Sequence, residues 1–403
     1  EIVLDKVGPK GVEAIFAGRN MHTIIFEEPL TSMNDMFVLL KSAEAFNSKQ
    51  THPSLTVRPV CVKREWFDAA TGAISKALYF DQARNVLREV TFSKPVPITG
   101  SVDIRHLYSA GEKKNHYALS EAIHALGRNI IQVNSAYSAR WADSKKRTHD
   151  IWDSEDIRTP KSLFLPMETT RSDIESKLQE FYRLIRDGDG KIRIVVQPNF
   201  GTEGEDAADF AVDELDMQDG SRVFEHIYSL SRRTSVVVTK FVGDVFYSET
   251  KNPSASDLRR FVIRANVVYD GRGRGYSVDS YGAFAGGNSE DFIISRRHGG
   301  RHIPVNGKSG LFNNLWIKED DGYRKVSLSV RNLAKLEAEI CDAAAAHNNG
   351  NSFENKRLLF GVDVMLQTRR NRDGSVDLVP YLKEDNARRS EERRVGKECT
   401  IQC

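Results

Sequence analysis

The chain has 403 residues, of which 40% are hydrophobic and 28% charged; this excludes a largely disordered protein and suits two or three domains. Its 58 basic and 56 acidic side chains nearly cancel, so no global field favours nucleic acid or an anionic membrane as a partner. The longest apolar stretches are far shorter than the ~20 residues of a membrane helix, so we expect no membrane span.

The first hundred residues carry mixed signals and no recognisable motif. Strands are predicted at 22–26, 54–63 and 85–98, and a helix near 34–45. We interpret residues 1–100 as an N-terminal α/β region of unknown role.

Residues 101–134 give a clearer pattern. VDIRHLYS predicts a strand, GEKKN a turn, HYALSEAIHALGR a helix that ends at Gly127, and NIIQVN a second strand. This order is typical of a βαβ unit in a Rossmann-like sheet, and a further helix is expected over 142–154.

The remaining sequence alternates helices with strands and predicts a mixed α+β region. Helices are expected at 172–186, 221–230 and 330–346, and strands at 191–198, 235–242, 259–270 and 276–284. DGRGRG at 270–275 joins two strands and opens no helix, so we interpret it as a hairpin turn and not as a dinucleotide fingerprint. A last hairpin pairs FGVDVML with VDLVPYLKEDNAR.

The last hairpin carries the strongest local chemistry. Glu384, Asn386 and Arg388 alternate onto one strand face, and Asp363 projects from the preceding strand. Carboxylate and amide oxygens suit magnesium, and Arg388 would add a forked donor for phosphate. The alternative is a solvated strand end with ordinary charges.

Two glycine-containing segments are candidate anion sites. After the strand KIRIVVQP, the loop NFGTEG offers Gly201 and Gly204 for close backbone approach to phosphates and Thr202 as a hydroxyl donor. It lacks the lysine of a Walker motif, which disfavours that class. RRHGGR at 296–301 suits a phosphate or carboxylate, although an exposed basic loop explains it equally well.

The C-terminal segment 389–403 reads like a translated sequencing-library adaptor, and we interpret it as a non-native tail. Without it the cysteines are Cys61 and Cys341, too few for a disulfide framework or a zinc site. A reducing cytoplasm is therefore the expected location.

Taken in order, these segments resemble the ATP-grasp superfamily, especially its glutathione synthetase and glutamate-adding ligase branch. Its successive motifs correspond to SKKRTHDIWDSEDIRTP, IVVQPNFGTEGEDA, VVVTKFVGD, DLRRFVI, RRHGGR, GVDVML and EDNAR. The resemblance implies a Rossmann-like pre-ATP-grasp unit at 101–160, followed at 161–388 by an ATP-grasp fold of two α+β subdomains.

The resemblance also implies roles for individual residues. ATP would be held by Lys145, Gln197, Gly201, Thr202, Gly204, Lys240 and Phe241; Mg²⁺ by Asp363, Glu384 and Asn386; and phosphate and carboxylate steered by Arg259, Arg301 and Arg388. Two positions depart from the family: Gln197 stands where a second phosphate-binding lysine is usual, and Lys240 where an acidic residue is common near adenine.

The activity implied is an ATP-dependent carboxylate–amine ligase that acts through an acyl-phosphate and forms a C–N bond. Its partners would be a small-molecule or peptide carboxylate and an amine, with no membrane and no nucleic acid; a homo-oligomer is left open. The alternative is an ATP-binding regulatory or interaction module without catalysis, which the departures at Gln197 and Lys240 favour.

Overall fold

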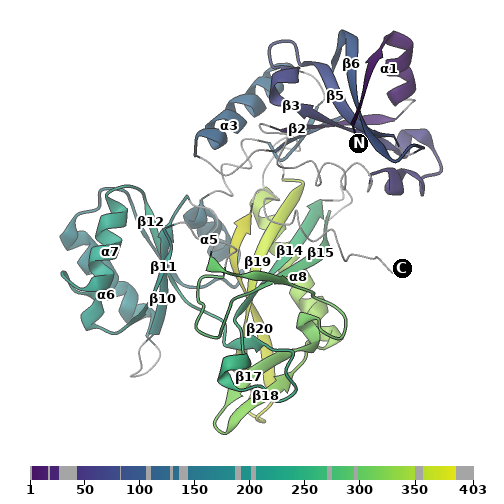
Figure 1. Ribbon diagram of the computed structural model, residues 1–403. Coiled ribbons are helices and arrows are strands. Elements are labelled where there is room, and N and C mark those ends of the chain that lie inside the picture. The colour runs from purple at the N-terminus through teal and green to yellow at the C-terminus, as the bar shows by residue number, and fades with distance from the viewer. Residues whose placement is uncertain are drawn as a thin grey trace. The chain divides into compact units, whose positions relative to one another are not determined.

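The computed structural model describes residues 2–16, 19–26, 43–81, 83–105, 110–127, 130–135, 144–186, 192–200, 206–269, 275–294, 298–349 and 357–386. The chain divides into two compact units. The first contains residues 1–139, 351–358 and 388–403, and the second contains 140–350 and 359–387. Figure 1 shows both units and labels most of their helices and strands.

The first unit is built on a mixed sheet whose described strands run in the order β1–β6–β5–β3–β2–β7–β8, with β4 paired to β5. Its elements are β1 (Ile2–Val7), α1 (Pro9–Phe16), β2 (Asn20–Phe26), β3 (Val57–Lys63), β4 (Phe67–Asp68), β5 (Ala73–Asp81), β6 (Val86–Pro97), β7 (Ser101–Arg105), α3 (Ala110–Ala125) and β8 (Ile131–Val133). Strand β2 pairs in parallel with β3 and β7, as in an α/β sheet.

The predicted βαβ unit is confirmed, because β7 and β8 pair in parallel and helix α3 connects them. Gly127 follows the helix with φ +62°, a conformation that glycine adopts at little cost. The predicted turn at 111–115 is wrong, since α3 already begins at Ala110. Strands β7 and β8 extend the sheet that residues 2–97 form, and the division of the chain into functional domains stays a prediction.

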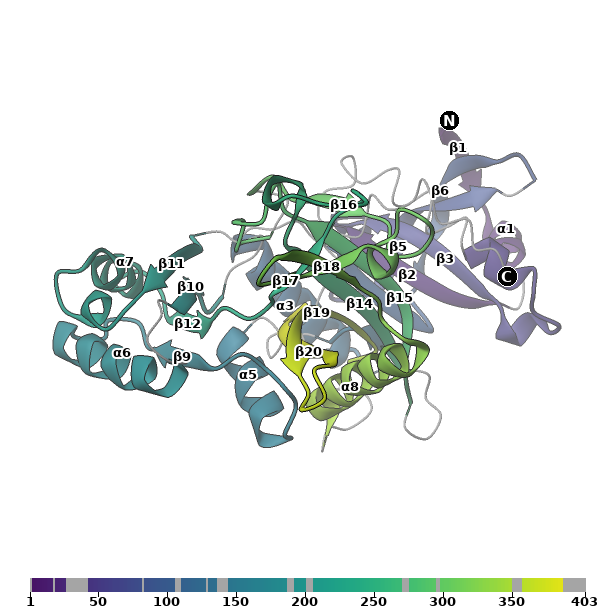
Figure 2. The same ribbon diagram turned by 90° about the horizontal axis from the view of Figure 1, so that it is seen from below.

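The second unit begins its α+β architecture with the β9–β12 sheet, whose described strands pair antiparallel in the order β11–β10–β12–β9. Its elements are β9 (Ser162–Leu165), α6 (Arg171–Ile185), β10 (Ile192–Pro198), β11 (Ala208–Val212), α7 (Arg222–Ser231) and β12 (Val236–Lys240). Helices α6 and α7 cover one face of this sheet (Figures 1 and 2). Ile194, Val196, Val236 and Val238 project into the core beneath them.

The β14–β20 sheet forms the other α+β part, with its described strands in the order β16–β15–β14–β19–β20. Its elements are β14 (Phe261–Tyr269), β15 (Tyr276–Ala285), β16 (Arg301–Ile303), α8 (Val330–Asn348), β19 (Leu359–Arg370) and β20 (Val376–Asn386), and α5 (Lys145–Ser154) packs against α8. A small sheet is formed by β13 (Val245–Tyr247), β17 (Leu315–Glu319) and β18 (Gly322–Val326).

Helix α8 lies against one face of the β14–β20 sheet (Figure 2), because Leu336 and Ile340 share a buried cluster with Ile263, Val362 and Val364. Trp152 of α5 is fully buried in the same cluster, and its Nε1 donates to the Ala343 carbonyl at 3.2 Å. The mixed α/β class and the two α+β subdomains predicted after the α/β start are therefore confirmed.

Both predicted hairpins are confirmed by antiparallel pairing of β14 with β15 and of β19 with β20. The short strands β9, β11, β13 and β16 were not predicted, because they have few residues and weak alternation. The helix predicted near 34–45 falls mostly outside the described residues.

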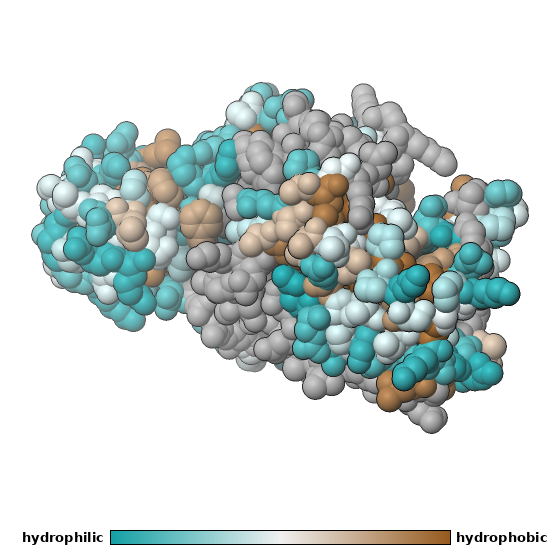
Figure 3. Space-filling model, turned by 90° about the horizontal axis from the view of Figure 1, so that it is seen from above, coloured by the Kyte–Doolittle hydropathy of each residue, from teal (hydrophilic) through white to brown (hydrophobic). Residues whose placement is uncertain are grey.

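The described surface seen in Figure 3 is mostly hydrophilic, with hydrophobic side chains scattered between. In the part of the chain that the structure describes, no helix is long and apolar enough to cross a membrane.

Candidate functional site

The start of helix α5 meets the end of strand β10. Ser144 caps the helix, with its hydroxyl accepting from the Arg147 backbone N–H at 3.3 Å. Asn199, directly after β10, accepts from the Lys146 N–H through its Oδ1 at 2.8 Å and from the Lys145 N–H through its carbonyl at 3.2 Å. Strand β10 thus ends beside a helix N-terminus whose first N–H groups are already bonded to Ser144 and Asn199. The positive end of the helix dipole and the Lys145 side chain are what favour an anion here.

Of the predicted nucleotide-binding residues, Gln197 and Lys240 project to opposite faces of the β9–β12 sheet. Gln197 pairs with Val237, whereas Lys240 pairs with Ile194, which projects into the core beneath α6 and α7. Directly paired residues share a face, so Gln197 lies on the face away from those helices. Gly201, Thr202 and Gly204 lie outside the described residues.

The Gln197 face is also the face of Phe164 and Thr239, by the same pairing rule. The Lys146 ammonium lies 5.4 Å from the centre of the Phe164 ring, which brings α5 to this face. The Thr239 hydroxyl is buried and has no hydrogen-bond partner among the described residues. A buried hydroxyl without a hydrogen-bond partner costs free energy, so this position suits a ligand that supplies the partner.

Three charged residues form a row across adjacent strands of the β14–β20 sheet. Arg264 of β14 pairs with Asp363 of β19, and Asp363 pairs with Glu384 of β20. Arg264 donates from Nε and Nη2 to the two carboxylate oxygens of Asp363 at 2.6 and 2.8 Å. Both residues are buried, with 6% and 7% of their surface exposed.

A β-bulge places Glu384 in this row. Asp363 pairs with Glu384 but the next residue, Val364, pairs with Leu382, so Lys383 is an extra residue in β20. Residues two apart normally share a face, but the extra residue reverses the alternation. Leu382 therefore points into the core while Glu384 projects on the Asp363 face, as the sequence analysis expected for these two carboxylates.

Lys145 connects the helix N-terminus to the charged row. Its Nζ lies 3.4 Å from Glu384 Oε1, and its side chain is only 7% exposed against 24% for Glu384. Burial opposes ionisation of Glu384, but the positive charges of Lys145, Lys383 and Arg264 outweigh it and lower the pKa of the carboxyl. Glu384 is thus an ionised carboxylate beside a predicted phosphate-binding lysine.

The donor set suits a single magnesium ion whose coordination shell is completed by phosphate oxygens. Asp363 and Glu384 offer two carboxylates on one face, and Asn386 follows on β20, although its side chain lies outside the described part. Among the residues that the structure describes, no group of three or more His, Cys, Asp or Glu side chains is placed to hold a metal. The site therefore fits magnesium only as a partly solvated or phosphate-bound ion.

His149 is a buried residue near this charged pair, and no pattern in the sequence singles it out. It lies one helical turn after Lys145, and its Nδ1 is 2.9 Å from the Thr159 hydroxyl. Burial lowers its pKa to about 4, so the imidazole is neutral at pH 7. It packs beneath Lys145 without adding a second positive charge.

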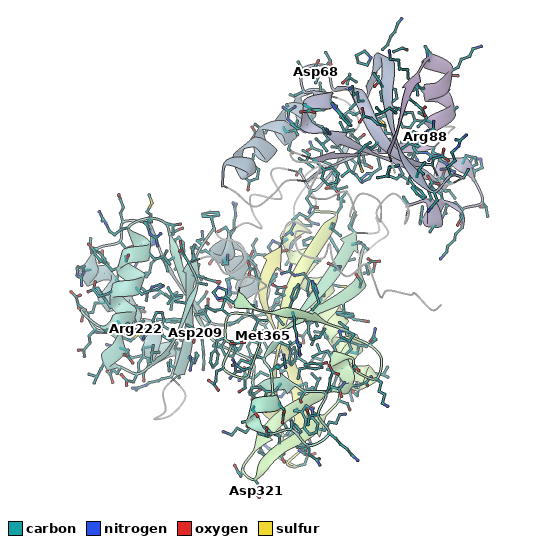
Figure 4. All side chains as sticks on the ribbon, in the orientation of Figure 1. Asp68, Arg88, Asp209, Arg222, Asp321 and Met365 are labelled. Carbon is teal, nitrogen blue, oxygen red and sulfur yellow. The ribbon has the colours of Figure 1, made fainter. Side chains whose placement is uncertain are left out.

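An apolar patch lies on the Asp363 face of the β14–β20 sheet, next to the residues that follow β12. Val262, Phe284 and Met365 form a buried cluster with Val242, and Phe241 packs against it; Met365 is labelled in Figure 4. Phe241 also meets Phe292 edge to face, with ring centres 4.8 Å apart. The predicted base-binding residue Phe241 therefore has apolar neighbours, and the Arg260 guanidinium lies 4.9 Å from its ring centre.

Arg259 and Arg301 do not join the charged row. Arg301 pairs with Ala285, whose side chain projects into the core on the α8 side. Arg301 therefore lies on one face of the sheet and Asp363 on the other. Both arginines lie near Tyr247, where their charges partly offset the burial and the Glu249 contact that raise its pKa. Asp257, which opens the DLRRFVI motif, lies in a 3-10 turn (Ala255–Asp257) before the strand.

Arg388 lies outside the described residues, so the structure places neither it nor the glycine loop. Reasoning from the sequence missed Arg264, Asn199 and His149. Arg264 was hidden because its partner is 99 residues away and only sheet register unites them. Asn199 carried one visible signal, a short polar residue directly before the predicted glycine loop.

Comparison with protein-family models gives no match, and neither does comparison with curated proteins. Among solved structures, the chain is similar to D-alanyl-alanine synthetase A of Vibrio cholerae, with 15% identity, 92% of this chain and 89% of that chain covered, and a TM-score of 0.46. D-cycloserine synthetase DcsG has 13% identity, 91% coverage of both chains and a TM-score of 0.49. The VanG D-Ala:D-Ser ligase of Enterococcus faecalis has 13% identity, 92% and 90% coverage, and a TM-score of 0.45.

Proposed function

We propose that this protein is an ATP-dependent carboxylate–amine ligase. The observation that carries the proposal is the contact between Lys145 and Glu384, 3.4 Å apart, which joins a lysine suited to phosphate to a carboxylate suited to magnesium. Phosphoryl transfer needs cations and donors around the phosphates more than a protein nucleophile, and this arrangement provides both. The resemblance of the sequence to the ATP-grasp superfamily agrees with it.

In this proposal the phosphates of ATP lie against the first turn of α5. Lys145 and the backbone donors of the loop with Gly201, Thr202 and Gly204 would bind them, with Gln197 donating from its amide. The unpaired hydroxyl of Thr239 lies on the same sheet face as Gln197 and would gain a partner from the ligand. Phe241, with the apolar patch behind it, would contact the base, and backbone groups near Lys240 would fix its edge.

Asp363, Glu384 and Asn386 would hold magnesium. The ion supplies charge neutralisation on the phosphoryl group when bound. Arg264 holds the Asp363 carboxylate in one orientation through two hydrogen bonds, which is the usual support for a ligating carboxylate. Arg388, Arg259 and Arg301 are still predictions from the resemblance as residues that steer phosphate and the substrate carboxylate.

The reaction begins with attack of a substrate carboxylate oxygen on the γ-phosphorus of ATP, which releases ADP and forms an acyl-phosphate. An amine then attacks the acyl carbon, the C–O bond to phosphate breaks, and an amide, phosphate and a proton result. No group of the protein forms a covalent intermediate. The carboxylate is a small molecule or a peptide.

The test is ADP release from Mg²⁺ and ATP in the presence of pooled carboxylates and amines, with phosphate release measured in parallel. We expect both products to appear only when carboxylate and amine are present together. The Glu384→Gln variant is the matched control, and it should be folded but inactive. Failure of the wild type to bind ATP in the presence of Mg²⁺ would exclude the proposal.

A second candidate function is an ATP-binding regulatory or interaction module without catalysis. It is favoured by Gln197, which is uncharged at a position where the resembled family has a lysine. Gln197→Lys would add a partly buried cation, and charge-assisted contacts of ~1.5–3 kcal/mol raise affinity about tenfold or more. ATP binding without ADP formation in both proteins, over the whole substrate pool, would support the regulatory module.

A further inference from the structure

The two carboxylates of the candidate metal site already face cations of the chain itself. Asp363 is paired with Arg264 through two hydrogen bonds, and Glu384 is paired with Lys145. Lys383, in the bulge beside Glu384, adds a further positive charge. The negative charge that would attract a divalent cation is therefore balanced or exceeded locally by three basic side chains.

We propose that these ion pairs make divalent-cation binding at Glu384 depend on the nucleotide, with Lys145 as the exchanging group. This inference rests on the proposed function. Without ATP, Lys145 occupies the Glu384 carboxylate; with ATP, the phosphates bind Lys145 and release the carboxylate for the metal. The site takes a divalent cation together with a polyphosphate, and takes the free cation weakly.

The two ion pairs differ in a way that assigns the exchange to Lys145. Arg264 is a planar donor held in two directions at 2.6 and 2.8 Å within a strand-to-strand pair, so it stays on Asp363. Lys145 makes a contact of 3.4 Å with Glu384 at the end of a flexible four-carbon chain. It also starts helix α5, next to the expected phosphates, so a small rotation of its side chain is sufficient.

The balance of charge around Glu384 predicts that bound nucleotide raises the affinity for a divalent cation. A divalent cation that approaches Glu384 meets the Lys145 ammonium and must displace it, whereas bound polyphosphate attracts both cations. Coupling between two ligands is reciprocal, so the cation must raise nucleotide affinity by the same factor. Removing the Lys145 charge takes away the ion pair between Lys145 and Glu384 and should strengthen binding of the free cation.

The experiment titrates Mn²⁺ into the full-length protein and follows the relaxation rate of water protons, which rises when Mn²⁺ binds a slowly tumbling protein. It is done without nucleotide and with a non-hydrolysable ATP analogue, and the manganese–analogue complex alone is the blank. For the wild type we expect saturable binding only with the analogue. For Lys145→Met we expect the nucleotide-free affinity to rise at least about tenfold, the size of one lost charge contact.

Two variants keep the result specific. Lys146→Met removes a positive charge one residue away, from a side chain paired with Asp150, and should leave nucleotide-free Mn²⁺ binding unchanged. The double variant Lys145→Met with Glu384→Gln should lose the gain, because the carboxylate that takes the cation is absent. Should Lys145→Met fail to fold, the wild-type comparison with and without analogue still decides the proposal.

Equal Mn²⁺ affinity of the wild type with and without the analogue would overturn the inference and leave the ligase proposal intact. A folded Lys145→Met variant with no gain would also overturn it. By contrast, absence of analogue binding to the wild type in calorimetry with Mn²⁺ present would reject the proposed function itself. The two failures are therefore distinguishable.

Discussion

The two ion pairs of the candidate site are built differently. Arg264 and Asp363 lie opposite one another on neighbouring strands, and both are almost completely buried. Lys145 and Glu384 come from a helix N-terminus and a bulged strand, and Glu384 is 24% exposed. The strand-to-strand pair has the geometry of a fixed support, and the helix-to-strand pair has the geometry of a contact that a ligand can replace.

The difference follows from what each backbone allows. Sheet hydrogen bonds on both sides of Arg264 and Asp363 fix the distance between their Cα atoms, so the side chains meet in one way. Lys145 is the first residue of α5, and its backbone N–H donates to the Asn199 carbonyl, while its side chain reaches across to Glu384 on another element. A comparison of variants in the two pairs should therefore separate effects on folding from effects on ligand binding.

The largest expected effect is on stability and comes from Arg264→Met. This change removes the two hydrogen bonds that Arg264 donates to the buried carboxylate of Asp363, and breaking a buried ion pair costs about 3–5 kcal/mol. Urea unfolding of the variant should show this loss in the free energy of unfolding. Replacing both residues, as in Arg264→Met with Asp363→Leu, should recover much of it; a single-variant loss below about 1 kcal/mol would show that the pair is not a fixed support.

The next effect concerns pH and His149, which lies beneath Lys145. Its pKa is about 4 in the folded protein against 6.5 ordinarily, so between these pH values the unfolded chain binds a proton that the folded protein does not. The contribution of the neutral, buried His149 to the free energy of unfolding is fully present above about pH 6.5 and is lost as the pH drops toward 4. The loss by pH 4 is on the order of 3 kcal/mol, from ~1.4 kcal/mol for each unit of pKa.

His149→Asn keeps a polar atom near Thr159 and removes the titration, so its stability should fall less between pH 6.5 and 4. His124 is exposed on α3, and His124→Asn is the matched control, which should behave as the wild type. Thermal unfolding monitored by circular dichroism over this range checks both. A pH slope in His149→Asn as steep as in the wild type would assign the titration to other groups.

A smaller effect on stability is expected for the exchangeable pair. Glu384→Gln should reduce the free energy of unfolding by only about 1 kcal/mol, because a partly exposed contact is screened by solvent. The same change should strongly weaken magnesium-dependent nucleotide binding, measured by calorimetry. Unchanged magnesium dependence in the folded variant would remove Glu384 from the metal site.

The sequence was sufficient for the order of the elements but not for the details of the site. The last hairpin could be predicted from alternating strands around a turn, and with it the meeting of Asp363 and Glu384. The reason that they meet, a bulge at Lys383, could not, because strict alternation puts Leu382 and Glu384 on one face. The role of Arg264 could not be predicted either, because it depends on the register between two strands that are far apart in the chain.

The strand faces also separated residues that the family resemblance had grouped. Gln197 and Lys240 are both near the ends of paired strands, but the pairing of Lys240 with Ile194 puts it on the side of α6 and α7. Arg301 is near the charged row in strand order and on the other face. A motif gives the place of a residue in the chain, and the register decides which surface it reaches.

The smallest expected effect comes from Lys146→Met. It tests whether the position of a lysine on α5, and not only its charge, decides how much the lysine matters. Lys146 follows Lys145 directly, but its ammonium pairs with Asp150 at i,i+4 on the exposed side of α5. Such pairs contribute about 0.3–0.5 kcal/mol, so Lys146→Met should reduce the free energy of unfolding by no more than about 0.5 kcal/mol in urea titrations. Lys145→Met removes the same charge from a buried contact with Glu384 and should change both stability and nucleotide binding more. If the two variants behaved alike, the charge of α5 as a whole, and not the Lys145–Glu384 contact, would be the property that matters.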